Sequence, residues 1–141
     1  MDRESVTQVP EHYISAVSEK DVDALLSLYD DNVRIFDLWG EWTHEGAPAW
    51  RQSVTDWFAS LGDQRVSVSF EDIRTIVAED LATLLSVITY RDMGTDGVAR
   101  GSMQNRLTWV LKRSGNHWKI VHEHTSAPVD FETQKVLLRR Y

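Results

Sequence analysis

The chain has no cysteine, no run of basic residues and no long apolar stretch. The absence of cysteine excludes a disulfide framework, a thiolate zinc site and a cysteine nucleophile. The 22 acidic and 15 basic side chains give a formal charge of -7, whereas phosphate recognition needs clustered Lys and Arg. The apolar residues 84–88 fall far short of the roughly 20 that span a bilayer. We therefore expect neither nucleic acid nor a membrane as a partner.

Several catalytic patterns are also missing. The sequence contains no glycine-rich phosphate loop, no Walker pattern and no Gly-x-Ser-x-Gly elbow, which argues against nucleotide hydrolysis and serine catalysis. The polar first five residues resemble neither a signal peptide nor a transit peptide, so a cytoplasmic location is expected. The 141 residues suit one domain, residues 1–141, and the six Trp, four Tyr and four Phe suit a packed core.

The first half of the chain is mainly helical in pattern. Apolar positions recur at helical spacing over residues 9–20, and Asp21 is placed as the N-cap of a second short helix. Residues 33–37 alternate like a strand, followed by a short hairpin that ends at Gly46. A third helix is expected from Pro48 to a stop at Gly62.

The second half has the period of strands. Apolar and polar residues alternate from Val66 onward, and turns are expected at residues 79–80, 94–97 and 114–116. These turns divide the region into four antiparallel strands of about 10 to 15 residues, long enough to bend. The phase changes between Phe70 and Ile73, and Gly101 lies inside a strand, so both places are candidate bulges. The pattern predicts an α+β domain with three N-terminal helices packed on a strongly curved antiparallel sheet, an arrangement that leaves a pocket.

Two segments carry a resemblance to known families. Residues 13–40, ending in Val-Arg-Ile-Phe-Asp-Leu-Trp-Gly, resemble without a gap the front of bacterial ketosteroid isomerases, which belong to the nuclear-transport-factor-2-like (NTF2-like) superfamily. Residues 118–128, Trp-Lys-Ile-Val-His-Glu-His-Thr-Ser-Ala-Pro, are similar to the last strand of SnoaL-like proteins and of the association domain of calcium/calmodulin-dependent kinase. The resemblance implies the cone-shaped NTF2-like fold, which carries isomerases, cyclases, dehydratases and assembly modules.

The resemblance also implies catalytic roles. Asp37 matches the carboxylate that moves a proton between carbons in the isomerases, and Tyr13 matches the hydrogen-bond donor to the enolate oxygen. An apolar site makes a carboxylate a better base, and a tyrosine hydroxyl stabilises an oxyanion without carrying charge. Two departures are visible: the second, protonated acid expected near residues 105–107 is absent, and Leu38 replaces a proline.

Each of these residues also has a plainer interpretation. Asp37 precedes a glycine turn and has the position of a turn-forming or capping residue, and Tyr13 has the position of a core residue. Phe36, Trp39 and Trp42 are candidates for an apolar lid over a ring-shaped ligand, and tryptophan is equally typical of subunit contacts.

Two histidines lie near the end of the last strand. His122 and His124 share one face with Trp118 and Ile120 if the alternation is unbroken. With this face turned inward, His124 is a candidate acid–base group and His122 a ligand contact; one hydrogen-bonded structural histidine is the alternative. A His-x-His zinc site with Asp37 or His44 is a weaker alternative, so we expect no metal and no cofactor.

Polar residues of the preceding strand complete the candidate site. Asn105 and Arg106 are adjacent, so one of them faces the pocket, and Arg106 suits a ligand carboxylate unless it lies on the exposed face. The apolar residues 129–141 are expected to form a docked tail.

Two functions remain open: a cofactor-independent isomerase, cyclase or dehydratase acting on a small apolar or ring-containing molecule, and a non-catalytic association or ligand-binding module. In both cases, the outward-facing Val, Ile and Leu of the long strands favour a homodimer.

Overall fold

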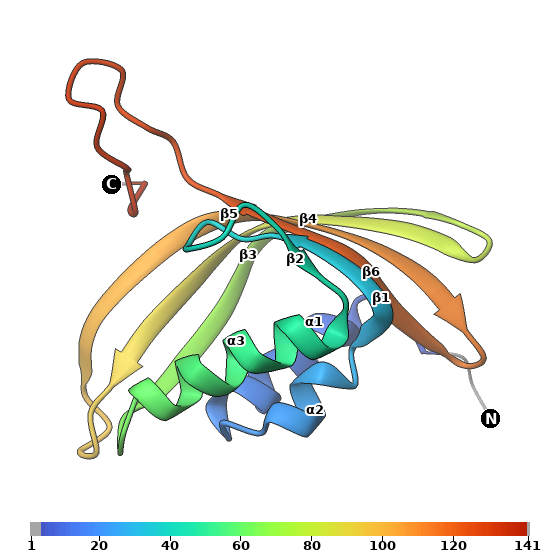
Figure 1. Ribbon diagram of the computed structural model, residues 1–141, viewed down its shortest axis with the longest axis horizontal. Helices are drawn as coiled ribbons and strands as arrows, with labels where there is room; N and C mark the ends of the chain where they lie inside the picture. Colours follow the sequence, from blue (N-terminus) through green and yellow to red (C-terminus); the bar gives the residue numbers. More distant parts are fainter. Residues whose placement is uncertain (1–3, 141) are drawn as a thin grey trace.

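The computed structural model describes residues 4–140, in which three helices lie against one face of a curved six-stranded sheet (Figure 1). The helices are α1 Gln8–Ser18, α2 Val22–Leu26 and α3 Ala47–Ser60. The strands are β1 Tyr29–Phe36, β2 His44–Glu45, β3 Arg65–Ala78, β4 Leu81–Met93, β5 Ala99–Ser114 and β6 His117–Ser126. The α+β architecture predicted from the sequence is confirmed.

Local signals in the sequence account for the helix ends. The Asp21 carboxylate accepts a hydrogen bond from the Ala24 amide at 3.0 Å, so it is the predicted N-cap of α2. Pro48 lies in the first turn of α3, where its missing N–H breaks no helical hydrogen bond. Gly46, just before α3, has a φ of +86°, a backbone conformation that favours glycine.

The strand order is β2-β1-β6-β5-β4-β3. All neighbours are antiparallel except β1 and β6, which are parallel. The prediction of a wholly antiparallel sheet is therefore wrong for this pair, and the sheet is mixed. Alternation within a strand does not encode its partner, and β1 pairs with a strand about 90 positions further along the chain.

Each of the three antiparallel pairings among the long strands β3 to β6 has one shift of register. The β3–β4 pairing shifts between Glu71 and Arg74, and the β4–β5 pairing shifts beside Gly101, as the sequence predicted. A third shift, between Val110 and Leu111 in the β5–β6 pairing, was not predicted. Bulges of this kind bend a strand and raise its twist, and the sheet curls around the helices (Figure 1).

The core lies between the helices and the inner face of the sheet. Fully buried side chains from α1, β4, β5 and β6 meet there, among them Val17, Leu84, Trp109 and Ile120. No helix within residues 4–140 is long and apolar enough to cross a membrane.

Candidate functional site

A cavity of about 600 Å³ lies between the helices and the inner face of the sheet. Aromatic side chains of Trp39, Trp50 and Trp57 form part of its wall. Its polar lining includes three carboxylates, Asp37, Asp92 and Glu123, and two tyrosines. This combination of an apolar wall with a few converging polar groups is typical of small-molecule sites.

Asp37 is held at the point where the chain leaves β1. The Thr125 hydroxyl donates to Asp37 Oδ1 at 3.0 Å, while the same hydroxyl accepts from the Leu38 amide at 2.8 Å. Burial raises the pKa of Asp37, and the Thr125 hydrogen bond and the electrostatic interaction with His44 partly oppose this rise. Asp37 is thus a fixed carboxylate at the cavity wall with a stronger proton affinity than one in water.

Tyr13 and Tyr90 bring two hydroxyl groups together at the same cavity. Their oxygens are 3.0 Å apart, and Tyr13 comes from α1 whereas Tyr90 comes from β4. Burial raises the pKa of both phenols, so both remain protonated at neutral pH. One hydroxyl donates to the other, which leaves a proton available for a ligand oxygen. Tyr13 is also packed edge-on against Phe70, so its core role and its position at the cavity are compatible.

Glu123 is a buried acid that the sequence analysis did not select. Its side chain comes from β6, and Tyr29 Oη and Trp109 Nε1 both donate to Oε1, at 2.6 and 2.8 Å. Burial raises the pKa of Glu123 to about 7, with a smaller upward contribution from the Asp37 charge. Among the described residues, none forms a hydrogen bond with Oε2. Glu123 can therefore hold a proton near neutral pH.

Asn105 also lines the cavity, and its Oδ1 atom is buried without a hydrogen-bond partner within the described part of the chain. A buried amide oxygen without a partner costs free energy, which a hydroxyl or amine on a ligand would recover. Of the candidates chosen from the sequence, the structure brings Asp37, Tyr13, Trp39 and Asn105 to one cavity.

His122, His124 and Phe36 lie instead on the outer face of the sheet. His124 is paired with Thr108 and His122 with Val110, whereas Glu123 is paired with the buried Trp109. The bulge in the β5–β6 pairing reverses the alternation, so the expectation that both histidines share a face with Trp118 and Ile120 is wrong.

The three outer-face rings contact one another. Phe36 packs edge-on against His122 and His124, with centroids 5.0 and 5.5 Å apart. His122 Nδ1 also lies 2.7 Å from the Arg34 carbonyl oxygen. The rings are therefore structural contacts on the outer surface and do not reach the cavity.

Arg106 and Trp42 are also outside the cavity. Arg106 is exposed on the outer face and donates to the Ser126 hydroxyl at 3.0 Å. Of the two interpretations of Arg106, the exposed arginine is therefore the one that the structure shows. The Trp42 side chain is 94% exposed in the β1–β2 connection. The cavity is also lined by residues that were not chosen from the sequence, including Tyr90, Trp57, Arg139 and Glu123.

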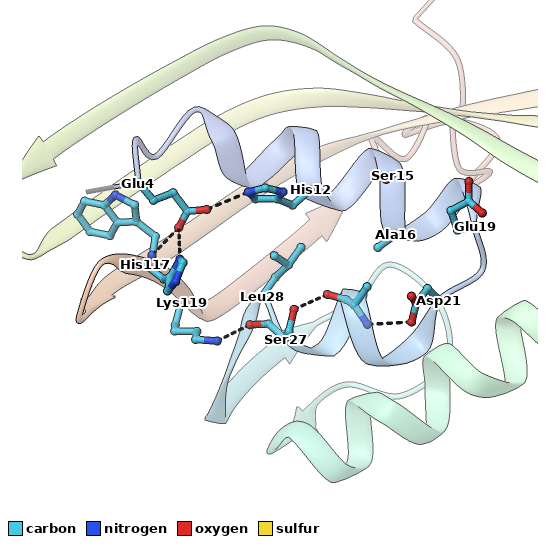
Figure 2. A pocket seen from close by; sticks show the side chains of 12 residues that line it. Glu4, His12, Ser15, Ala16, Glu19, Asp21, Ser27, Leu28, His117 and Lys119 are labelled. Carbon is cyan, nitrogen blue, oxygen red and sulfur yellow. Dashed lines mark hydrogen bonds and ion pairs between the residues drawn. The ribbon is translucent and has the colours of Figure 1, made fainter. Parts of the chain in front are cut away.

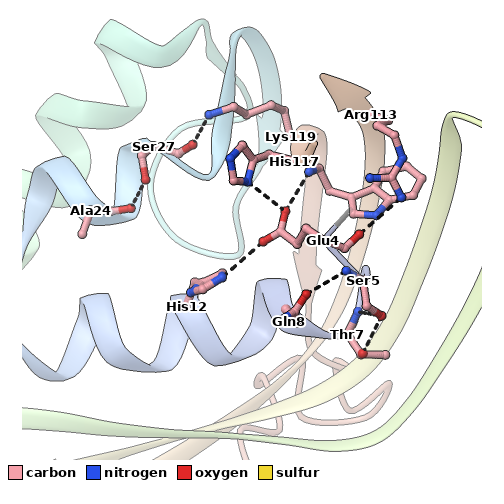
Figure 3. Close-up of polar contacts among 11 residues, drawn as sticks. Glu4, Ser5, Thr7, Gln8, His12, Ala24, Ser27, Arg113, His117 and Lys119 are labelled. Atoms are coloured by element: carbon pink, nitrogen blue, oxygen red, sulfur yellow. Dashed lines mark hydrogen bonds and ion pairs between the residues drawn. The ribbon is translucent and has the colours of Figure 1, made fainter. Parts of the chain in front are cut away.

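A second, more polar cleft of about 420 Å³ lies between α1, α2 and the start of β6. Figure 2 shows Glu4 there between His12 and His117, with distances of 3.2 and 3.8 Å from its oxygens to their ring nitrogens. The Glu4 carboxylate also accepts from the Trp118 amide at 2.8 Å. Figure 3 shows the contact in which the Glu4 carbonyl accepts from Arg113. These contacts tie Glu4, the first residue that the structure describes, to β5 and β6. Within residues 4–140, no group of three or more His, Asp or Glu side chains is arranged to hold a metal ion.

Sequence comparison agrees with this architecture. The model of the SnoaL-like domain matches residues 6–130. The chain belongs to the SnoaL-like family. No curated protein sequence matches it significantly.

Solved structures extend the comparison. An NTF2-like protein of unknown function from Pseudomonas putida is 25% identical, with a TM-score of 0.83 over 96% of this chain and 93% of that one. A putative aromatic ring hydroxylase from Novosphingobium aromaticivorans is 21% identical, with a TM-score of 0.71 over 89% and 87%. A putative calcium/calmodulin-dependent kinase association domain from Xanthomonas campestris is 14% identical, with a TM-score of 0.70 over 91% and 95%. These neighbours show that this SnoaL-like chain has the NTF2-like fold.

Proposed function

We propose that this SnoaL-like protein is a cofactor-independent enzyme that moves a proton on a small, ring-containing molecule. One observation carries the proposal: a largely apolar cavity brings together an ionisable Asp37, a proton-holding Glu123 and the Tyr13–Tyr90 pair of hydroxyls. Such a set supplies a base, an acid and an oxyanion donor without a cofactor.

The proposed reaction begins at a carbon next to a carbonyl group. Asp37 removes the proton from this carbon, and the electron pair of the C–H bond moves toward the carbonyl oxygen to form an enolate. The Tyr13–Tyr90 pair donates a hydrogen bond to that oxygen. Asp37 then returns the proton to a different carbon, so the product is an isomer and no atom is gained or lost.

Glu123 has the role of the second acid. Its raised pKa keeps it protonated for part of the time at neutral pH, and its Oε2 atom is left free of the Tyr29 and Trp109 hydrogen bonds. A protonated carboxyl in an apolar site donates a strong hydrogen bond to an enolate. Glu123 thereby replaces the acid that is absent from residues 105–107.

Solvent exchange tests this proposal. Cyclic β,γ-unsaturated ketones are incubated with the protein in D₂O, and proton NMR follows both deuterium uptake beside the carbonyl and migration of the double bond. Wild-type protein is expected to accelerate one or both, and Asp37→Asn to lose at least about a hundredfold of that rate. Arg106→Gln, on the outer face, is the matched control. Equal rates for wild type and Asp37→Asn would refute the role of Asp37.

The second candidate function, association, is favoured by the outer face of the sheet. We propose that this face pairs two copies of the chain, because Ile76 and Leu85 expose 70% and 44% of their surface there. In the strand pairing, Thr83 lies between Ile76 and Val110. A monomer would leave this apolar strip in water. Sedimentation equilibrium at micromolar concentration is expected to give twice the chain mass, and a monomer mass would exclude the association.

A further inference from the structure

Residues 138–140 are anchored to β5 at the cavity lip. β6 ends its pairing at Ser126, opposite Arg106, so the earlier part of β5 has no β6 partner on that edge. Figure 1 shows the tail leaving β6, extending away from the sheet and returning toward β5. There the Gln104 amide donates to the Leu138 carbonyl at 2.6 Å, and the Arg140 amide donates to Gln104 Oε1 at 2.9 Å.

A closed ring of side chains fixes the same segment. Gln104 Nε2 donates to Thr89 Oγ1 at 3.0 Å, and Thr89 Oγ1 donates to Glu71 Oε1 at 3.0 Å. Arg140 completes the ring through an ion pair with Glu71 Oε2. The ring crosses β3, β4 and β5, and together with the bond from the Gln104 amide to Leu138 it holds the backbone on both sides of Arg139.

Arg139 is thereby directed to the cavity. Both of its neighbours in the chain are bonded to Gln104, Leu138 through its carbonyl and Arg140 through its amide. Arg139 lines the cavity together with Met103 and Asn105. It is the only basic side chain among the described lining residues, and it forms no ion pair or hydrogen bond within residues 4–140.

We infer that Arg139 is a specificity residue that binds a carboxylate on the ligand at the cavity lip. A guanidinium recognises a carboxylate with two parallel hydrogen bonds, and within residues 4–140 no carboxylate, including that of Asp92 in the same cavity lining, forms an ion pair with Arg139. The inference rests on the proposed function of the cavity and narrows its substrate to a ring-containing acid. The ring system occupies the aromatic part of the cavity, and the acid group remains at the lip where water is accessible.

Two probes of equal shape test the inference: 2-naphthoate, which is an anion, and 2-naphthamide, which is neutral. Their dissociation constants are measured by calorimetry with the full chain and with Arg139→Gln, Arg139→Lys and Arg106→Gln. Wild type is expected to prefer the anion by about fivefold to tenfold at low salt. Arg139→Gln is expected to lose this preference while binding the neutral probe as before. Arg139→Lys is expected to keep part of the preference, and Arg106→Gln all of it.

The outcomes separate the inference from the proposed function. If both probes bind equally well, or if Arg139→Gln keeps the preference for the anion, the inference is overturned and the cavity remains a binding site. If neither probe binds to wild type, the proposed function fails and the inference fails with it. Arg139 is exposed, so its substitution does not threaten folding, and circular dichroism checks this.

Discussion

Burial costs the ionised form of Glu123 more free energy than its two hydrogen bonds recover, which holds its pKa at about 7. The Tyr29 and Trp109 donors would be left without an acceptor if an apolar residue stood there. Burying the ionised form of Glu123 costs free energy. A buried acid with a pKa near neutrality is well suited to gain and lose a proton during the proposed reaction.

Glu123 therefore makes stability depend on pH. Between pH 4.5, the ordinary carboxyl pKa, and about 7, the folded chain holds a proton on Glu123 that the unfolded chain has released. Raising the pH through this window thus lowers the free energy of unfolding, by about 3 kcal/mol in total from this group. Urea unfolding at pH 5, 6, 7 and 8 should show this fall. In Glu123→Gln, which keeps an acceptor for both donors, the fall should shrink to the share that Asp37 and other groups contribute; an identical fall would contradict the assignment.

Thr125 tunes the candidate base. Its hydroxyl lowers the pKa of Asp37, against the larger upward effect of burial. Thr125→Val removes this hydrogen bond at nearly constant shape, so we expect the pKa of Asp37 to rise further, followed by carbon-13 NMR of its carboxyl. The loss of the acceptor for the Leu38 amide should also lower stability by about 1 kcal/mol. Thr125→Ser keeps the hydroxyl and should resemble wild type; a rise of the pKa in both variants would exclude the hydrogen bond as the cause.

At the scale of elements, single-residue irregularities decide which side chains face the cavity. The register shift between Val110 and Leu111 places Glu123 and Thr125 inward while Ile120 also stays inward. Without the shift, strict alternation would put either Ile120 or Glu123 on the outer face. The bulge is thus what allows one strand to supply both the core and the candidate site.

The backbone of Gly46, the residue before α3, has an unusual conformation. With φ +86° and ψ 157° it occupies a region open almost only to glycine, and its amide donates to the Val33 carbonyl at 2.7 Å. Gly46→Ala should therefore lower the free energy of unfolding by about 1 to 3 kcal/mol, measured by urea titration. Gly101→Ala is the matched control, since its φ is not positive and the new Cβ meets only Asp92 Oδ2 at 3.8 Å. Equal stability changes in the two variants would show that backbone conformation at Gly46 is not limiting.

At the scale of the whole molecule, the two faces of the curved sheet have different surroundings. The inner face packs on the helices and encloses the cavity. The outer face carries an apolar strip, and the tail bears further exposed apolar residues, including Phe131 and Leu137. The proposed dimer can thus use the sheet, the tail or both.

Substitutions that introduce a charge test which of these two surfaces, the sheet face or the tail, forms the proposed dimer interface. Leu85→Lys places a cation in the middle of the outer face and is expected to convert the proposed dimer to a monomer in light scattering, because a buried unpaired charge costs several kcal/mol. Leu137→Lys tests the tail in the same way. If only the tail variant dissociates, the tail carries the association; if both variants remain dimers, neither surface forms the interface.

Much of the fold follows from local sequence. Helical spacing, the Asp21 cap, Pro48 and the turn residues determine where the three helices and the strands lie along the chain, since these signals act within a few residues. The family resemblance placed Asp37 and Tyr13, which do line the cavity. The parallel β1–β6 pair was not predictable, because it joins segments far apart in the chain.

The rest of the candidate site was decided by tertiary structure. The sequence alone shows Glu123 between two histidines, and only the bulge in the β5–β6 pairing determines that the glutamate faces inward and the histidines outward. Arg139 lies in a tail with no regular period, and it reaches the cavity because Gln104, on β5, holds its neighbours. A side chain's direction depends on register and on distant hydrogen bonds, and these are properties of the assembled sheet rather than of any short segment.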